Sequence, residues 1–253
     1  MSFGINMKIA KGLEMLEIHG SMFGNPGVFH PTLIWDDSEV VLVDTGLPGQ
    51  LELIREAVEK AGVSFDSISK IIITHQDMDH IGSLSAIVRN SIRDVEVFSH
   101  EVEKPYIQGD LTPIKMTPQR IAQQEIMLNK LPEEKRNEIT KIFSNLSAKV
   151  DITVEDGQLL PFCGGIEVIF TPGHTPGHIS LYLKKHKTLI TGDALNVIEG
   201  KLCGPNPQFT NNMEEAVASL KKLSKYDIET VICYHGGLYS DNANNRIKEL
   251  FSV

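Results

Sequence analysis

One stretch of the sequence decides the fold: Thr74-His75-Gln76-Asp77-Met78-Asp79-His80. It follows Lys70-Ile71-Ile72-Ile73, a β-branched run that is typical of a buried strand, and it precedes a predicted helix that ends near residue 90. Two histidines and two aspartates therefore lie in a loop at a strand end, where α/β folds collect ligands and catalytic groups. Imidazole and carboxylate donors together suit zinc, iron or manganese; a polar, solvated loop is the alternative.

Strands and helices alternate on both sides of this stretch. A second apolar run, Val40-Val41-Leu42-Val43, ends in Asp44-Thr45-Gly46, and the residues at 48–61 have the apolar spacing of a helix. Residues 12–34 alternate loosely and predict two strands at a sheet edge. Further short apolar runs lie at 95–98, 166–170, 188–191 and 230–234. This alternation predicts an α/β layer architecture, in one domain that spans residues 1–253.

Residues 101–148 interrupt the alternation. Thr117-Pro118 and Leu131-Pro132 each begin a predicted helix, because proline is favoured in the first helical turn. We interpret this segment as a helical insertion between strands. It either covers one face of the sheet or forms a lid over the site. Its length exceeds that of a normal connection, so we expect its helices to border the site and to influence substrate choice.

The same event recurs at four strand ends: an apolar run stops and a histidine or aspartate follows. The four cases are the 75–80 loop, His174, Asp193 and His235, each beside glycine or proline. Strands of one sheet end along a common edge, so these side chains can converge there. A single histidine at a strand end is usually a hydrogen-bonded turn residue, whereas four coincident cases predict a transition-metal site.

The set of motifs resembles that of the metallo-β-lactamase superfamily, in particular its lactonase and glyoxalase II-like branches. The matching motifs are His75-x-Asp77-x-Asp79-His80, Pro172-Gly-His-Thr-Pro-Gly-His178, Thr191-Gly-Asp-Ala194 and Tyr234-His-Gly-Gly237. The resemblance extends over nearly the whole chain, from Asp44 to His235. It implies a four-layer αββα sandwich with a two-metal site at one edge.

The resemblance also implies a role for each matching residue. His75, Asp77 and His174 would hold a first divalent metal ion, and Asp79, His80 and His235 a second. Asp193 would bridge the two ions, and Asp44 would orient a ligand loop from behind. The chain departs from the pattern at Asp77, where most hydrolases of the family have histidine. The implied cofactors are two divalent metal ions: zinc, with iron or manganese as alternatives.

This reading predicts a metal-dependent hydrolase. A hydroxide bound to a dinuclear metal centre would attack a small ester, lactone or thioester, and Asp79 would orient it and pass a proton to the leaving group. Acyl-homoserine lactonases usually carry tyrosine where this chain has Asn196. The residues that bind the substrate are left unassigned. The alternatives are a diiron-type oxidoreductase, suggested by Asp77, a phosphodiesterase, and a non-catalytic binding scaffold.

Composition limits the partners. The formal net charge of −9 and the lack of a Lys/Arg block argue against nucleic acid. The chain has no apolar run long enough to span a membrane, and Met1–Lys8 lacks the apolar core of a secretory signal. Three scattered cysteines give no disulfide framework. We therefore expect a cytoplasmic protein that acts on a small molecule; its oligomeric state is left open.

Overall fold

The computed structural model describes residues 5–22 and 25–251. Residues 1–4, on which the cytoplasmic prediction partly depends, lie outside this range. In chain order the elements are β1 (Met7–Ala10), β2 (Leu13–Met15), β3 (Ile18–Met22), β4 (Asn25–Phe29), β5 (Thr32–Trp35), β6 (Val40–Val43), α1 (Leu51–Lys60), η1 (Phe65–Ser67), β7 (Lys70–Ile72), α2 (Met78–Ile81), α3 (Leu84–Asn90), β8 (Glu96–His100), α4 (Lys104–Ile107), α5 (Pro118–Asn129), α6 (Glu133–Phe143), β9 (Ile152–Val154), β10 (Leu159–Leu160), β11 (Ile166–Phe170), β12 (Ile179–Leu183), η2 (Lys184–His186), β13 (Thr188–Ile190), β14 (Asn196–Ile198), β15 (Lys201–Cys203), α7 (Met213–Leu223), β16 (Thr230–Cys233), β17 (Gly237–Tyr239) and α8 (Ala243–Leu250).

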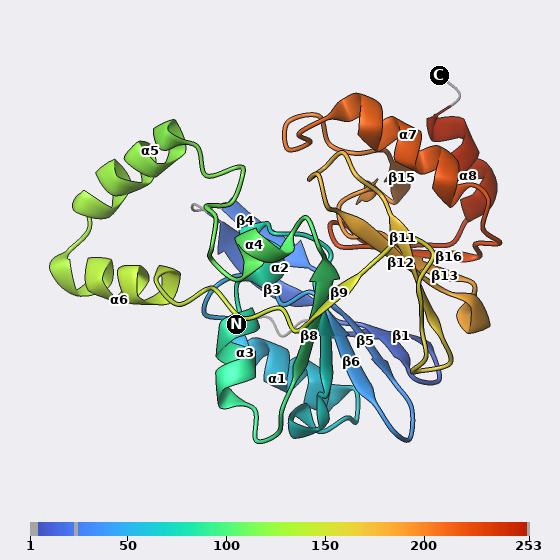
Figure 1. Cartoon of the computed structure of the whole chain (residues 1–253), viewed down its shortest axis with the longest axis horizontal. Coiled ribbons are helices and arrows are strands. Elements are labelled where there is room, and N and C mark those ends of the chain that lie inside the picture. Colours follow the sequence, from blue (N-terminus) through green and yellow to red (C-terminus); the bar gives the residue numbers. More distant parts are fainter. Residues whose placement is uncertain (1–4, 23–24, 252–253) are drawn as a thin grey trace.

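Two mixed sheets face each other, and helices lie on their outer sides (Figure 1). Within the described residues, the first sheet has the strand order β1-β2-β5-β6-β7-β8-β9 and the second the order β10-β11-β12-β13-β16-β17. In the first sheet β6 to β9 run parallel to one another. In the second sheet β13 and β16 are the parallel pair. Because parallel strands end at the same edge, the loops that follow them are brought together.

Three apolar layers hold the sandwich together. Along β6, Val41 and Val43 point to the layer between the sheets, whereas Val40 and Leu42 point to α1 and α3. This follows from the pleat, which turns successive side chains to opposite faces. A third layer lies between the second sheet and the helices α7 and α8. Burial of both faces explains why these strands are almost wholly apolar, and the predicted αββα architecture is confirmed.

The N-terminal region contains more strands than predicted. Residues 12–34 form β2 to β5 in place of two edge strands. β2 and β5 join the first sheet, whereas β3 and β4 pair with each other in a separate hairpin, and Phe29 of β4 also forms an isolated bridge with His235. The loose alternation did not distinguish this hairpin from the sheet, because both have the same period of two.

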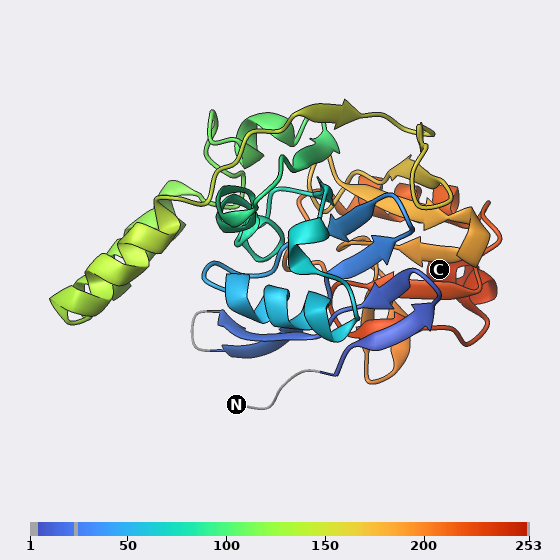
Figure 2. The same cartoon turned by 90° about the horizontal axis from the view of Figure 1, so that it is seen from below.

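The insertion consists of the short helix α4, whose Ile107 is buried in the core, and two longer helices. α5 and α6 form an arm that projects from the body of the sandwich (Figures 1 and 2). α5 begins as predicted, with Pro118 in its first turn and the Thr117 hydroxyl accepting a hydrogen bond from Arg120 N, but none of its described residues is buried. The arm returns to its base, where Ala148 N donates to Ile107 O at 3.3 Å. Of the two alternatives for the insertion, a cover on one face of the sheet therefore does not apply to α5 and α6, and the expectation that these helices border the site stays a prediction.

In the part of the chain that the structure describes, no helix combines the length and the apolar character needed to cross a membrane.

Candidate metal centre

Five strand ends meet at one edge of the sandwich. Asp44 follows β6, the 75–80 loop follows β7, His174 follows β11, Asp193 follows β13 and His235 follows β16. Each strand is short and buried, so its end fixes where the next polar side chain emerges. The chain therefore uses both sheets to assemble a single polar cluster.

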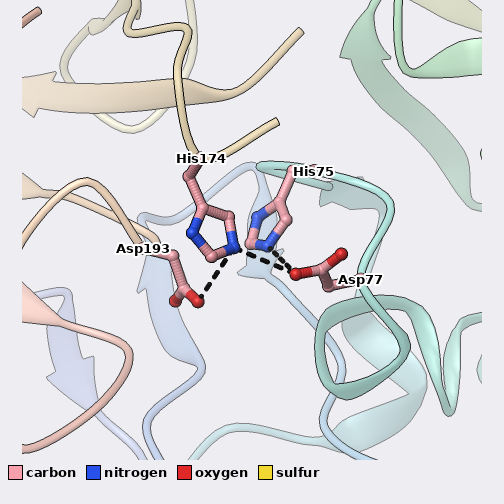
Figure 3. A group of neighbouring side chains, drawn as sticks. All are labelled: His75, Asp77, His174 and Asp193. Carbon is pink, nitrogen blue, oxygen red and sulfur yellow. Dashed lines mark hydrogen bonds and ion pairs between the residues drawn. The ribbon is translucent and has the colours of Figure 1, made fainter. Parts of the chain in front are cut away.

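The predicted ligands form two groups. One consists of His75, Asp77, His174 and Asp193, and the other of Asp79, His80 and His235; within each group the candidate ligand atoms lie within 4.8 Å of one another. Figure 3 shows the four side chains of the first group turned toward a common centre. The structure thus brings together all seven side chains that were proposed from the sequence as metal ligands.

Asp193 touches both groups. Its Oδ1 lies 3.2 Å from His80 Nε2, and its Oδ2 lies 3.3 Å from His174 Nε2. The same Oδ2 lies 3.4 Å from His235 Nε2. A carboxylate between two groups of imidazoles is positioned to share its two oxygens between two cations.

The Asp77 side chain is directed at the histidine cluster and does not cap the helix that follows it. Asp77 is the N-cap residue of α2, where aspartate normally accepts a hydrogen bond from its own helix, but it makes no such bond to any described residue. Instead its Oδ2 lies 2.9 Å from His174 Nε2 and 3.3 Å from His75 Nε2. Burial alone would raise the pKa of Asp77, but His75, His174 and Lys115 hold it well below its usual range. The carboxylate is therefore charged and directed at the cluster.

Several candidate ligand atoms in the cluster make no hydrogen bond, although they lie close to one another. His75 Nε2, His80 Nε2 and Asp193 Oδ1 are buried and make no hydrogen bond within the described residues. Buried polar atoms without partners are costly, so their convergence indicates a ligand that would satisfy them. Imidazole nitrogens mixed with carboxylate oxygens are donors that divalent transition metals accept. The residues present therefore fit two divalent ions.

Asp44 lies directly behind the second group. Its Oδ2 is 2.9 Å from His80 Nδ1, and its two oxygens accept hydrogen bonds from the Thr74 amide and hydroxyl at 2.9 and 2.8 Å. Burial would lower the pKa of His80, but the carboxylates of Asp44, Asp193 and Asp79 raise it well above its usual value. A carboxylate on Nδ1 fixes the ring so that Nε2 faces the cluster.

Tyr234 and His178 also support the cluster from behind. The Tyr234 hydroxyl donates to Asp79 O and accepts from Gly46 N at 3.1 Å. His178 Nε2 accepts a hydrogen bond from Asp193 N at 3.0 Å, and burial lowers the pKa of His178 to about 3, so its ring is neutral. The sequence interpretation treated His178 as a structural or supporting residue and missed Tyr234, although Tyr234 directly precedes His235.

Glu103 joins two ligand loops and was also missed. Its Oε2 accepts from the Gln76 amide and side chain, both at 2.9 Å, and its Oε1 accepts from Gly177 N at 2.7 Å. The loop of His75 and the loop of His174 are therefore tied to one buried carboxylate. No local signal marked Glu103, because it lies in the insertion and its partners are distant in the sequence.

Known proteins provide an independent comparison. The family model of the metallo-beta-lactamase superfamily matches residues 30–235, a range that contains all seven candidate ligands. A Bacillus subtilis (strain 168) protein named probable metallo-hydrolase YflN is 32% identical over 254 residues, covering 92% of this chain and 87% of that protein. Hydroxyacylglutathione hydrolase GloC of Haemophilus influenzae is 26% identical over 168 residues, which is 65% of either chain. Among solved structures, a metallo-beta-lactamase family protein of Thermus thermophilus has a TM-score of 0.71 at 24% identity, with 97% of this chain and 80% of that chain covered.

Proposed function

Because this chain belongs to the metallo-beta-lactamase superfamily, we propose that it is a dinuclear metal-dependent hydrolase of small esters, lactones or thioesters. The observation that carries the proposal is the convergence of seven histidine and aspartate side chains into two groups that share Asp193. In this proposal His75, Asp77 and His174 would hold one ion and Asp79, His80 and His235 the other, with Asp193 lying between the two groups.

The bound ions would supply Lewis acidity and a water molecule activated for attack at neutral pH. The protein would position the groups that bind the ions and the attacking water. Asp44 orients the His80 ring, His178 accepts from the backbone of Asp193, and Glu103 ties together the loops that carry His75 and His174. Asp79 is fixed through its own backbone, since its carbonyl oxygen accepts from the Tyr234 hydroxyl. Its carboxylate, 3.2 Å from His235 Nε2, would orient the attacking water, take a proton from it and pass that proton to the leaving group.

The substrate class has separate support. The likeness to a hydroxyacylglutathione hydrolase favours acyl transfer to water over phosphoryl transfer. The net charge of −9 disfavours nucleic acid as the substrate, because binding it requires a basic surface. A small acyl compound agrees with both observations.

The test combines metal analysis with a substrate panel. The purified protein is stripped with a chelator, reloaded with zinc, manganese or ferrous iron, and assayed on lactones, thioesters, simple esters, phosphodiesters and β-lactams. We expect two equivalents of metal and turnover of an ester, lactone or thioester. A fully loaded protein that hydrolyses only phosphodiesters contradicts the proposed substrate class, and oxygen consumption with bound iron would favour a diiron oxidoreductase.

Zinc is the proposed metal, and Asp77 is the reason to include the others. A carboxylate is a harder ligand than imidazole, so it raises the relative affinity of the first site for iron and manganese. Comparing activity after reloading with each metal separately therefore tests the metal identity.

A further inference from the structure

A lysine from the insertion reaches the candidate metal centre. Lys115 lies between α4 and α5, and its Nζ lies 2.7 Å from His174 Nε2 and donates to Asp77 Oδ2. The Lys115 side chain is 20% exposed, so it is in contact with the cluster and with solvent at once. It is therefore a partly exposed positive charge next to the first ligand group.

The backbone that carries Lys115 is held in place. Ile114 N donates to Gln76 Oε1 at 2.8 Å, and the Gln76 side chain is held in turn by Glu103. On the other side, Arg120 Nη1 donates to Lys115 O at 3.2 Å. These contacts tie the segment to the loop that supplies His75 and Asp77. The base of the Lys115 side chain is thus fixed within reach of the site.

A cation in this place has a clear electrostatic consequence. When Asp77 and His174 hold a metal ion, a lysine ammonium cannot stay against the same two atoms, because like charges repel. The four-carbon stem is flexible, so the ammonium would turn toward solvent while its backbone stays held by Gln76 and Arg120. There it can meet an anionic group of a molecule that is bound over the metals. The chain as a whole has a net charge of −9 and repels anions, so a local positive charge is needed to attract an anion to this site.

We propose that Lys115 is a specificity-determining residue that binds a carboxylate of the substrate. The preferred substrates are then small esters or thioesters with a carboxylate a few bonds away from the acyl carbon. This inference rests on the proposed hydrolase function and adds to it the charge of the substrate.

The test compares a charged and a neutral ester of similar length, mono-p-nitrophenyl glutarate and p-nitrophenyl valerate. Lys115→Met removes the charge at similar length, Lys115→Arg keeps it, and Lys130→Met is the matched control at the exposed end of α5. We expect Lys115→Met to lower kcat/KM for the glutarate ester by about tenfold or more, as for the loss of one charge-assisted hydrogen bond, chiefly through KM. The neutral ester should change by less than about twofold on the same basis. Lys115→Arg and Lys130→Met should resemble the wild type.

A second measurement does not depend on turnover. Glutarate binding to the zinc-loaded protein is followed by calorimetry, with metal content measured on the same samples, and inorganic phosphate is the comparison anion. We expect Lys115→Met to lose glutarate binding while it keeps two equivalents of zinc. Tighter binding of phosphate than of glutarate would overturn the choice of carboxylate.

Failure of this inference and failure of the proposed function are distinguishable. If both esters lose activity equally in Lys115→Met, or neither does, Lys115 does not determine specificity. If the wild type binds two zinc ions but hydrolyses no compound in the panel, the proposed function is wrong; Lys115-dependent glutarate binding would still support the anion site. A wild type that binds no glutarate overturns the Lys115 inference.

Discussion

The two halves of the candidate metal centre are supported in different ways. The Asp79, His80 and His235 half is backed by buried groups of the sandwich, namely Asp44 on His80 Nδ1 and Tyr234 on Asp79 O. The half with His75, Asp77 and His174 is backed by Glu103 and touched by Lys115, both from the insertion. The comparison indicates that both halves are supported by the core of the fold, since Thr74 Oγ1 lies 3.0 Å from His75 Nδ1, and that the first half is in addition tied to the insertion.

The largest effect should come from the residue that both halves share. Asp193→Ala removes a carboxylate that contacts His80, His174 and His235, so both groups lose a donor. We expect kcat/KM to fall by about 10³-fold or more, which corresponds to ~4 kcal/mol, together with metal content. Steady-state kinetics and metal analysis measure this, with the exposed Asp241→Ala as the control. Near-normal turnover in Asp193→Ala would remove the basis for treating the halves as one centre.

The next largest effect should separate the halves. Asp44→Ala removes the acceptor behind His80 Nδ1 and leaves Glu103 in place. We expect metal affinity at one of the two sites to fall about 10- to 100-fold, as is typical for residues that orient a metal-bound histidine. Titration with a chelating dye measures both sites, and Asp37→Ala, in an exposed turn of the same region, is the control. Equal weakening of both sites would contradict the separate support of the halves.

The stability of the protein should depend on pH through His178, which accepts a hydrogen bond from Asp193 N. Burial lowers the pKa of His178 to about 3, whereas the unfolded chain takes up this proton near 6.5. Keeping the ring neutral in the folded protein therefore costs almost no free energy of unfolding at pH 7.5 or above, and stability is lost progressively as the pH falls through 6.5 toward 3. At pH 5.5 the loss is about 1.4 kcal/mol relative to pH 7.5 or above.

This loss is measured as the free energy of unfolding in urea, with the metal-free wild type and His178→Asn compared from pH 7.5 to 5.5. The wild type should lose more stability than the variant over that range. Parallel profiles would show that His178 is not the group that titrates.

The smallest effect should concern the choice of metal. Asp77→His replaces a hard carboxylate with imidazole, so the first site should shift several-fold toward zinc and away from manganese and iron. Asp77→Ala should lose occupancy at one site only. Competition between metals, followed by elemental analysis, measures both, and Asp94→His on the surface is the control. If both variants bind two equivalents with unchanged preference, Asp77 is not a ligand and the halves do not differ in this way.

The sequence predicted most of the layers and the convergence of histidines and aspartates at one edge, because both depend on local patterns. An apolar run identifies a buried strand, and the residue after it lies at the sheet edge, which located Asp44, His174 and Asp193 without long-range information. The roles of Glu103 and Lys115 depend on contacts with residues distant in the sequence, and neither has a periodic or motif signal. The direction of α5 and α6 was equally unpredictable, since helical spacing shows which residues share a face and not what that face meets.

The arm has a consequence for how this protein could diversify. Its two ends meet at the base, where Ala148 N donates to Ile107 O, and the described residues of α5 contribute no buried side chain. Segments with adjoining ends and little burial tolerate insertion, deletion and exchange, because closing a longer loop costs little. The chain that enters the arm also carries Lys115 into the site. Recombination at residues 107–148 would therefore exchange the segment that carries Lys115 and leave the seven clustered histidines and aspartates in place.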